Sequence, residues 1–138
     1  MSREQHKILI VTQPTRLEEL RQKFNTTAQA KFYVECLGAD FEDYLREDDG
    51  YRRSLDRVRA AAEGVARVQT VPKAYLPNLL LGEKDVVIAL GRDGLVANTM
   101  KYLRGQQLLG VNPDPERWDG RLLPFRPGEL ERVLPQVL

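Results

Sequence analysis

The sequence predicts an α/β protein, a three-layer Rossmann-like domain in which helices cover both faces of a mostly parallel sheet. Three observations support this prediction. Strand patterns alternate with helix patterns along the chain, the run 85–90 is apolar enough to be buried on both faces, and it ends in the glycine-bracketed turn 91–94. Parallel strands joined through helices give a sheet that is covered on both sides.

Length and composition restrict the domain organisation and the class of partner. The chain has 138 residues, enough for one domain with its own core, and we expect residues 1–138 to form a single domain. Its 21 basic and 20 acidic residues leave a formal net charge of +1. Such a balance does not attract nucleic acid or an anionic membrane, so a small-molecule partner is expected.

The single cysteine and the amino terminus indicate the compartment. Cys36 has no second cysteine with which to form an intrachain disulfide, and we interpret it as a small buried hydrophobic residue. Residues 1–7 lack the apolar stretch of a signal peptide, and no run approaches the ~18 apolar residues that span a bilayer. The expected location is therefore the cytoplasm.

A strand and a helix follow each other directly at the start of the chain. Residues 7–12 are a β-branched run typical of a central strand, which Pro14 ends. Residues 15–18, Thr-Arg-Leu-Glu, match a capping box and predict the start of a helix. Arg16 lies in the first turn of that helix, where it is either a phosphate ligand or a solvated side chain.

Helix patterns occupy the next part of the chain. A short helix is expected over 29–38, from the spacing of its apolar residues, and a long amphipathic helix over 41–65, interrupted near Gly50. The other face of the long helix is dense in Arg and Glu, which we interpret as a solvated surface without chemistry.

The second half of the chain repeats the alternation. We expect strands at 68–71, 85–90 and 108–111, an edge strand at 122–125, an apolar connector over 75–81, a helix after residue 94 and a terminal helix over 128–138.

Two loops that follow strands carry the candidate site residues. Gly91, Arg92, Asp93 and Gly94 stand between the buried strand and a helix, whose first N–H groups attract phosphate. Asn112 and Asp114 follow the next strand, and a proline after each of them keeps both extended. If sequential strands are neighbours, both loops line one crevice.

A carboxylate beside a phosphate-binding helix end suits phosphoryl transfer, in which an acid orients the attacking hydroxyl and takes its proton. Asp93 is the candidate for this role. The alternative is an ordinary turn before a helix, with Asp93 as the helix cap.

The motifs around these loops resemble a known family. Residues 85–94, followed by a helix and by Gly110-Val111-Asn112, resemble the amino-terminal domain of the ATP-dependent NAD kinases, whose signature is strand, Gly-Gly-Asp-Gly, helix, strand and Gly-Ile-Asn. The form found here is similar to a bacterial branch of NAD-kinase-like or sugar-kinase-like proteins. Residues 15–20, 31–33 and 75–78 extend the resemblance over most of the chain.

The resemblance implies roles for the loop residues. Asp93 would activate the acceptor hydroxyl, in NAD kinases the 2′-hydroxyl of the adenosine ribose, and Gly91 and Gly94 would let phosphate oxygens approach the backbone. Mg²⁺ with ATP, or polyphosphate in some members, would be the phosphoryl donor. No dedicated metal site made of protein ligands is expected, because the acidic residues lack metal-ligand spacing. Members of the family commonly self-associate, so a homo-oligomer is one expectation.

The chain departs from the family pattern in two loops and in length. Arg92 replaces the second glycine, and if that position needs a positive φ, the side chain costs roughly 1–2 kcal/mol unless it binds a phosphate or carboxylate. Residues 113–115, Pro-Asp-Pro, replace a glycine-rich continuation, which leaves the acceptor open between NAD and another compound. The family's carboxy-terminal all-β domain is absent from these 138 residues, so the resemblance implies that half of the crevice is encoded here.

The sequence therefore predicts an NAD-kinase-like phosphotransferase domain that transfers phosphate from ATP to a hydroxyl of NAD or a related nucleotide or sugar, with turnover dependent on a second domain. The alternative is a non-catalytic nucleotide-binding module, whose binding depends on Arg92 and not on Asp93. A third hypothesis is a folded domain that binds nothing. Trp118 is either a packing residue or a stacking surface for a base.

Overall fold

The computed structural model describes residues 7–138, which group into two compact units. The first unit contains residues 7–13 and 54–138 and holds the sheet; the second contains residues 14–53 and is helical. Within the described residues, no helix is long and apolar enough to cross a membrane.

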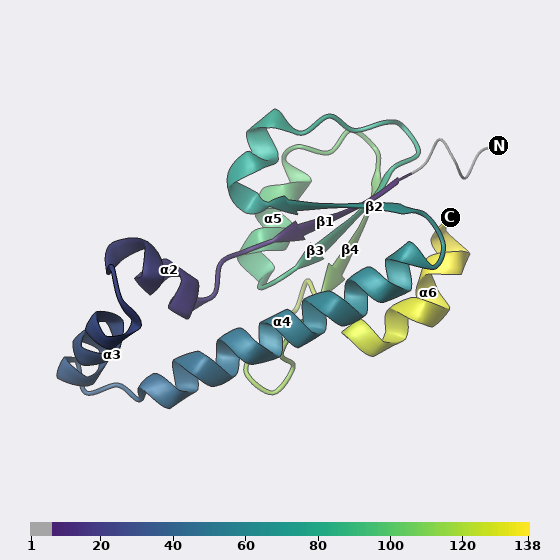
Figure 1. Ribbon diagram of the computed structural model, residues 1–138. Helices are drawn as coiled ribbons and strands as arrows, with labels where there is room; N and C mark the ends of the chain where they lie inside the picture. The colour runs from purple at the N-terminus through teal and green to yellow at the C-terminus, as the bar shows by residue number, and fades with distance from the viewer. Residues whose placement is uncertain (1–6) are drawn as a thin grey trace. The chain divides into compact units, whose positions relative to one another are not determined.

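The first unit is built on an all-parallel sheet, as predicted. Its strands are β1 (Lys7–Thr12), β2 (Arg67–Pro72), β3 (Val86–Leu90) and β4 (Gln107–Val111), and their order across the sheet is β2-β1-β3-β4 (Figure 1). Every neighbouring pair runs parallel. The α/β class is thereby confirmed, and the architecture is consistent with a Rossmann-like fold.

Strand composition explains these positions. Every residue of β3 is buried, as expected for a strand covered on both faces, and Ile8–Val11 of β1 are fully buried as well. β2 lies at the edge of the sheet and is largely exposed. Its last residue, Pro72, is tolerated because an edge strand does not need every N–H in the ladder.

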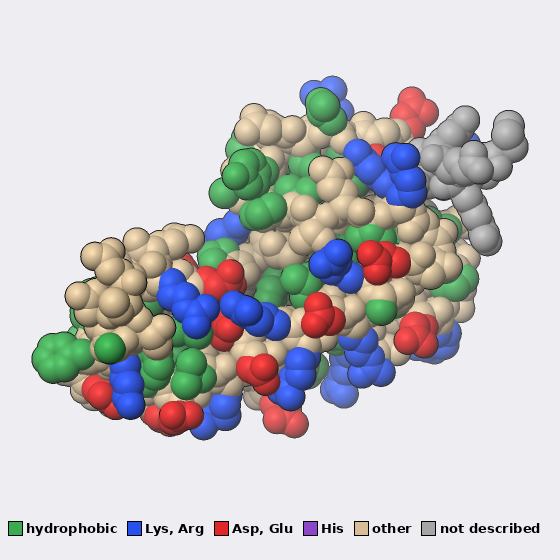
Figure 2. Space-filling view, viewed as in Figure 1, with side chains coloured by type: hydrophobic (Ala, Val, Ile, Leu, Met, Phe, Trp, Pro, Cys, Tyr) green, Lys and Arg blue, Asp and Glu red, His purple; other side chains and the backbone are tan. Residues whose placement is uncertain are grey.

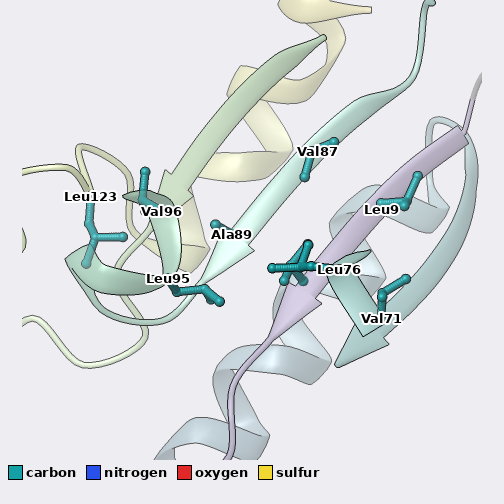
Figure 3. Close-up of a cluster of buried hydrophobic side chains, with 9 residues drawn as sticks. Leu9, Val71, Leu76, Val87, Ala89, Leu95, Val96 and Leu123 are labelled. Atoms are coloured by element: carbon teal, nitrogen blue, oxygen red, sulfur yellow. The ribbon is translucent and has the colours of Figure 1, made fainter. Parts of the chain in front are cut away.

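Helices cover both faces of this sheet. On one face, strand residues 9, 11, 87 and 89 pack against Leu95 and Val96 of α5 (Asp93–Met100) and Leu76 of the 3₁₀ helix η1 (Lys73–Asn78) (Figure 3). Alternate residues of a strand point to opposite faces, so residues 8, 10, 88 and 90 face the other side. The second half of α4 (Phe41–Glu63) and α6 (Leu130–Val137) lie there (Figures 1 and 3). The first unit thus has three layers.

The predicted edge strand at 122–125 is wrong. This segment forms a single parallel bridge, between Phe125 and Val111, in which the N–H of Asn112 donates to the carbonyl of Phe125 at 2.9 Å. The ladder does not extend back along the segment because the N–H of Leu123 donates to the carbonyl of Gly120 at 3.0 Å, within a turn, and not to β4. The chain continues through η2 (Pro127–Glu129) into α6, which confirms the predicted terminal helix.

The second unit contains α2 (Arg16–Lys23), α3 (Thr27–Cys36) and the first part of α4. The predicted capping box is confirmed: the Thr15 hydroxyl accepts from the Glu18 N–H at 3.2 Å, and the Thr15 N–H donates to the Glu18 carboxylate at 3.1 Å. The Thr15 hydroxyl also donates to the buried carboxylate of Asp48 at 2.6 Å.

The predicted interruption of the long helix near Gly50 is wrong, because α4 is continuous from Phe41 to Glu63. Its ion pairs at i,i+4 spacing, Asp48 with Arg52 and Asp49 with Arg53, bracket the glycine and help to offset its cost of roughly 1 kcal/mol. Acidic and basic side chains are interspersed along α4 (Figure 2), as predicted for a solvated surface.

The interpretation of Cys36 as a buried residue is also wrong, because its side chain is exposed. Ala30 and Val34 form the buried stripe of α3, whereas Phe32 and Leu37 are exposed. The helix itself was predicted correctly, but its larger apolar residues were assigned to the wrong face.

Candidate functional site

The two predicted loops meet at the carboxyl edge of the sheet. β1 is followed by Gln13, β3 by Gly91 and β4 by Asn112. The chain order of the strands reverses between β1 and β3, with β2 on one side and β4 on the other. In open parallel sheets, ligands bind in the crevice outside the carboxyl ends of the strands at such a reversal.

Gln13 connects the ends of β1 and β3. Its side-chain oxygen accepts from the backbone N–H of Arg92 at 3.2 Å. A Cβ on Gly91 would lie 2.4 Å from that same oxygen, so a larger residue there would push the Gln13 side chain out of this position. The N–H of Gly91 also donates to the carbonyl of Val111 at 3.3 Å. Sequence reasoning missed Gln13, although its position as the polar residue directly after the central strand was a usable signal.

Asp93 is the first residue of α5, and its carboxylate binds backbone from a distant segment. One oxygen accepts from the N–H of Leu122 at 2.9 Å and the other from the N–H of Arg121 at 3.3 Å. The interpretation of Asp93 as the helix cap is wrong, because Arg92 occupies the cap position. An ionised carboxylate offers about four acceptor positions, so both oxygens retain capacity for a ligand.

Arg92 takes up its position without backbone strain. Its φ is −92°, and no described residue other than glycine has a positive φ. The cost foreseen for a side chain in the turn therefore does not arise. The exposed guanidinium carbon lies 4.0 Å from the centre of the Trp118 ring, and that of Arg117 lies 5.9 Å from it. Trp118 thus packs against a cation.

The start of α5 is open. Within 4 Å of a Cβ built on Gly94 there is no neighbouring atom, and φ at Gly94 is not positive. The described hydrogen bonds of the first turn begin with the N–H of Leu95, which donates to Arg92. The N–H groups of Asp93 and Gly94 come before it, and such leading amides at a helix start attract anions.

Asn112 and Asp114 shape their loop. Asn112 is buried, its side-chain nitrogen donates to the carbonyl of Trp118 at 2.8 Å, and its side-chain oxygen accepts from the N–H of Asp114 at 2.9 Å. The Asp114 carboxylate pairs with the Nε of Arg117 at 3.2 Å. Both residues lie at the predicted edge, where they hold the loop that presents Trp118 to Arg92.

Comparison with known proteins adds no constraint. No family model matches the chain, and no curated protein sequence matches it either.

Arg16, predicted as either a phosphate ligand or a solvated side chain, lies in the helical unit, where it pairs with two carboxylates. Its guanidinium pairs with Asp43 at 2.8 Å and with Glu47, and it lies over the Tyr44 ring at 4.1 Å. Partial burial disfavours the charge, but the two carboxylates outweigh that effect and raise the pKa of Arg16 above its ordinary value. This environment favours a structural role for Arg16.

The acidic residues do not assemble a cage for Mg²⁺. Across residues 7–138, no group of three or more His, Cys, Asp or Glu side chains is placed to hold a metal. Asp114 is paired with Arg117, and the Asn112 side-chain oxygen is used within its loop. Asp93 has spare acceptor capacity. This suits a Mg²⁺ ion that arrives bound to phosphate groups and takes one or two carboxylate ligands from the protein.

Proposed function

We propose that the carboxyl edge of the sheet binds the phosphate groups of a nucleotide, and that the chain is the nucleotide-binding domain of an NAD-kinase-like phosphotransferase. The supporting observation is that the open start of α5 directly follows β3, beside the reversal between β1 and β3, and that the same turn carries the Arg92 guanidinium, which lies against Trp118 of the loop after β4. Phosphate favours such a combination of leading amides and a planar cation.

The Arg92 side chain is suited to this role because its surroundings orient it without neutralising it. Its described partner is the Trp118 ring, which leaves the guanidinium donors available for phosphate oxygens. The backbone of Arg92 is fixed by Gln13, so the turn is shaped before a ligand arrives. A preformed turn reduces the entropic cost of binding.

For phosphoryl transfer, Asp93 is the candidate base. It lies directly beside the proposed phosphate site and is only partly buried, so an acceptor hydroxyl can reach it. Its described hydrogen bonds hold residues 121 and 122, which gives it a structural role in addition. Its carboxylate would take the proton of the acceptor hydroxyl while the hydroxyl oxygen forms its bond to phosphorus.

Titration calorimetry with ATP and ADP-ribose, and with adenosine as the ligand without phosphate, tests the binding proposal. We expect both phosphorylated ligands to bind, adenosine to bind at least tenfold more weakly, and Arg92→Ala to weaken ATP binding about tenfold. Arg132→Ala, which removes an exposed arginine from α6, is the matched control and should leave affinity unchanged. Equal ATP affinity in the Arg92→Ala variant, or no ATP binding at millimolar concentration, contradicts the proposal.

Asp93→Asn separates binding from catalysis. The amide keeps one acceptor oxygen for the 121–122 backbone, so we expect ATP affinity within about threefold of wild type and a loss of stability of about 1 kcal/mol. Where the wild type transfers phosphate to NAD or another alcohol, followed by ³¹P NMR, the variant should be at least ~100-fold slower. Unchanged turnover rejects Asp93 as the base. Because turnover is expected to depend on a second domain, ATP binding without turnover favours the non-catalytic module only in a protein that includes such a domain.

A further inference from the structure

A hollow of about 400 Å³ lies away from the carboxyl edge. One wall is η1 with the segment that follows it, and the other is the loop 101–106, which joins α5 to β4. That loop ends at the start of β4, so this rim lies at the amino edge of the sheet, at the opposite end of the strands from Asp93. The volume of the hollow falls in the range of small-molecule sites.

Most of the lining residues are apolar, although polar and apolar atoms share the exposed surface of the hollow about equally. Leu80 is 85% exposed and Tyr102 is 38% exposed, although both line a concave surface. Exposed apolar area of this kind gains free energy when an apolar ligand covers it. The leucines that line the hollow are Leu76, Leu79, Leu80, Leu81 and Leu103.

The charged groups of the lining are both cations. Lys101 and Arg104 stand on the loop between α5 and β4, and the described contacts of their side chains include no ion pair. Gln106 fixes the shape of this loop: its side-chain oxygen accepts from the Arg104 N–H at 2.6 Å, and its nitrogen donates to the Gly82 carbonyl at 3.1 Å. The two cations are thus carried on a loop that is attached to the opposite wall.

We propose that this hollow binds an amphipathic monocarboxylate, with its apolar chain against the leucines and its carboxylate at Lys101 and Arg104. An apolar wall selects an apolar body, and a pair of cations without acidic neighbours in the lining selects an anionic head. This site is separate from the proposed nucleotide site and does not depend on it.

The test compares three probes that have unbranched apolar chains of similar length and differ in head-group charge: octanoate, octanol and octyltrimethylammonium. Binding to the full chain is followed by the amide shifts in ¹H–¹⁵N NMR spectra. We expect octanoate to shift the amides of residues 76–81 and 101–106 in a saturable way, and the other two probes to bind at least tenfold more weakly. Equal binding of octanol, or shifts confined to other residues, overturns the proposal.

Two variants test where the carboxylate and the apolar chain of the ligand bind. Lys101→Ala combined with Arg104→Ala should remove the tenfold preference for octanoate over octanol, whereas Arg59→Ala combined with Arg132→Ala changes net charge equally and should preserve it. Leu80→Gln changes a side chain that is 85% exposed, so the fold should be kept while octanoate binding weakens about fivefold. Full octanoate binding in both site variants is the result that rejects this site.

Discussion

Replacing Gly110 with alanine is expected to destabilise the protein by about 3 kcal/mol. Gly110 is a buried residue of β4, and a Cβ built on it would lie 2.1 Å from the backbone carbonyl oxygen of Leu122. A backbone atom cannot rotate away as a flexible side chain can, so either β4 or the 121–125 segment must move. The bridge between Val111 and Phe125 is the contact most directly affected. Urea unfolding followed by circular dichroism measures the loss.

Gly50→Ala is the matched control for this prediction. It makes the same chemical change inside α4, where no atom lies within 4 Å of the added Cβ. Because alanine restricts the unfolded chain and suits a helix, we expect a gain of about 0.5–1 kcal/mol. If Gly110→Ala also falls within 1 kcal/mol of wild type, the close packing of Leu122 on β4 is wrong.

Replacing Asp85 with alanine is expected to cost about 2–3 kcal/mol. Asp85 directly precedes β3 and is 4% exposed. One carboxylate oxygen accepts from the N–H of Lys7 at 3.2 Å and the other from the N–H of Gly82 at 2.8 Å. The change leaves both donors without an acceptor at the start of the two central strands. Thermal and urea unfolding measure the loss.

Asp85→Asn provides the internal comparison. The amide keeps the shape and one acceptor oxygen, but its NH₂ group faces the second backbone donor, so a smaller loss of about 1–2 kcal/mol is expected. Glu83→Ala, two residues earlier on an exposed position, should change stability by less than about 0.5 kcal/mol. Equal stability of wild type and Asp85→Ala means that the carboxylate does not hold the strand starts.

The parts of the fold that could be predicted depend on local chemistry. The capping box at Thr15 and the buried strand before Gly91 follow from side-chain hydrogen bonding and continuous apolarity, which neighbouring residues determine. The errors have tertiary causes. Ion pairs and the Thr15–Asp48 contact support α4 through Gly50, and the buried face of α3 carries small residues instead of its aromatic ones.

The same distinction applies to the candidate site. The proximity of Gly91 to Asn112 was predictable, because strands that follow one another in a parallel sheet usually pair. The attachment of Asp93 to residues 121 and 122 was not, because its partners are backbone N–H groups, which every residue except proline has. The stacking of Arg92 on Trp118 likewise joins residues whose contact no local pattern indicates.

The packing of Trp118 against Arg92 has a practical consequence. Trp118 is the only tryptophan in the chain. Fluorescence excited at wavelengths that only tryptophan absorbs therefore comes from one position, beside the carboxyl edge of the sheet. A ligand that draws the guanidinium away from the ring changes the indole's surroundings and hence its emission. A molecule that enters the leucine-lined hollow at the amino edge leaves the indole's surroundings as they were. The fluorescence of the unlabelled protein can therefore report a ligand at the carboxyl edge without interference from a molecule in the hollow.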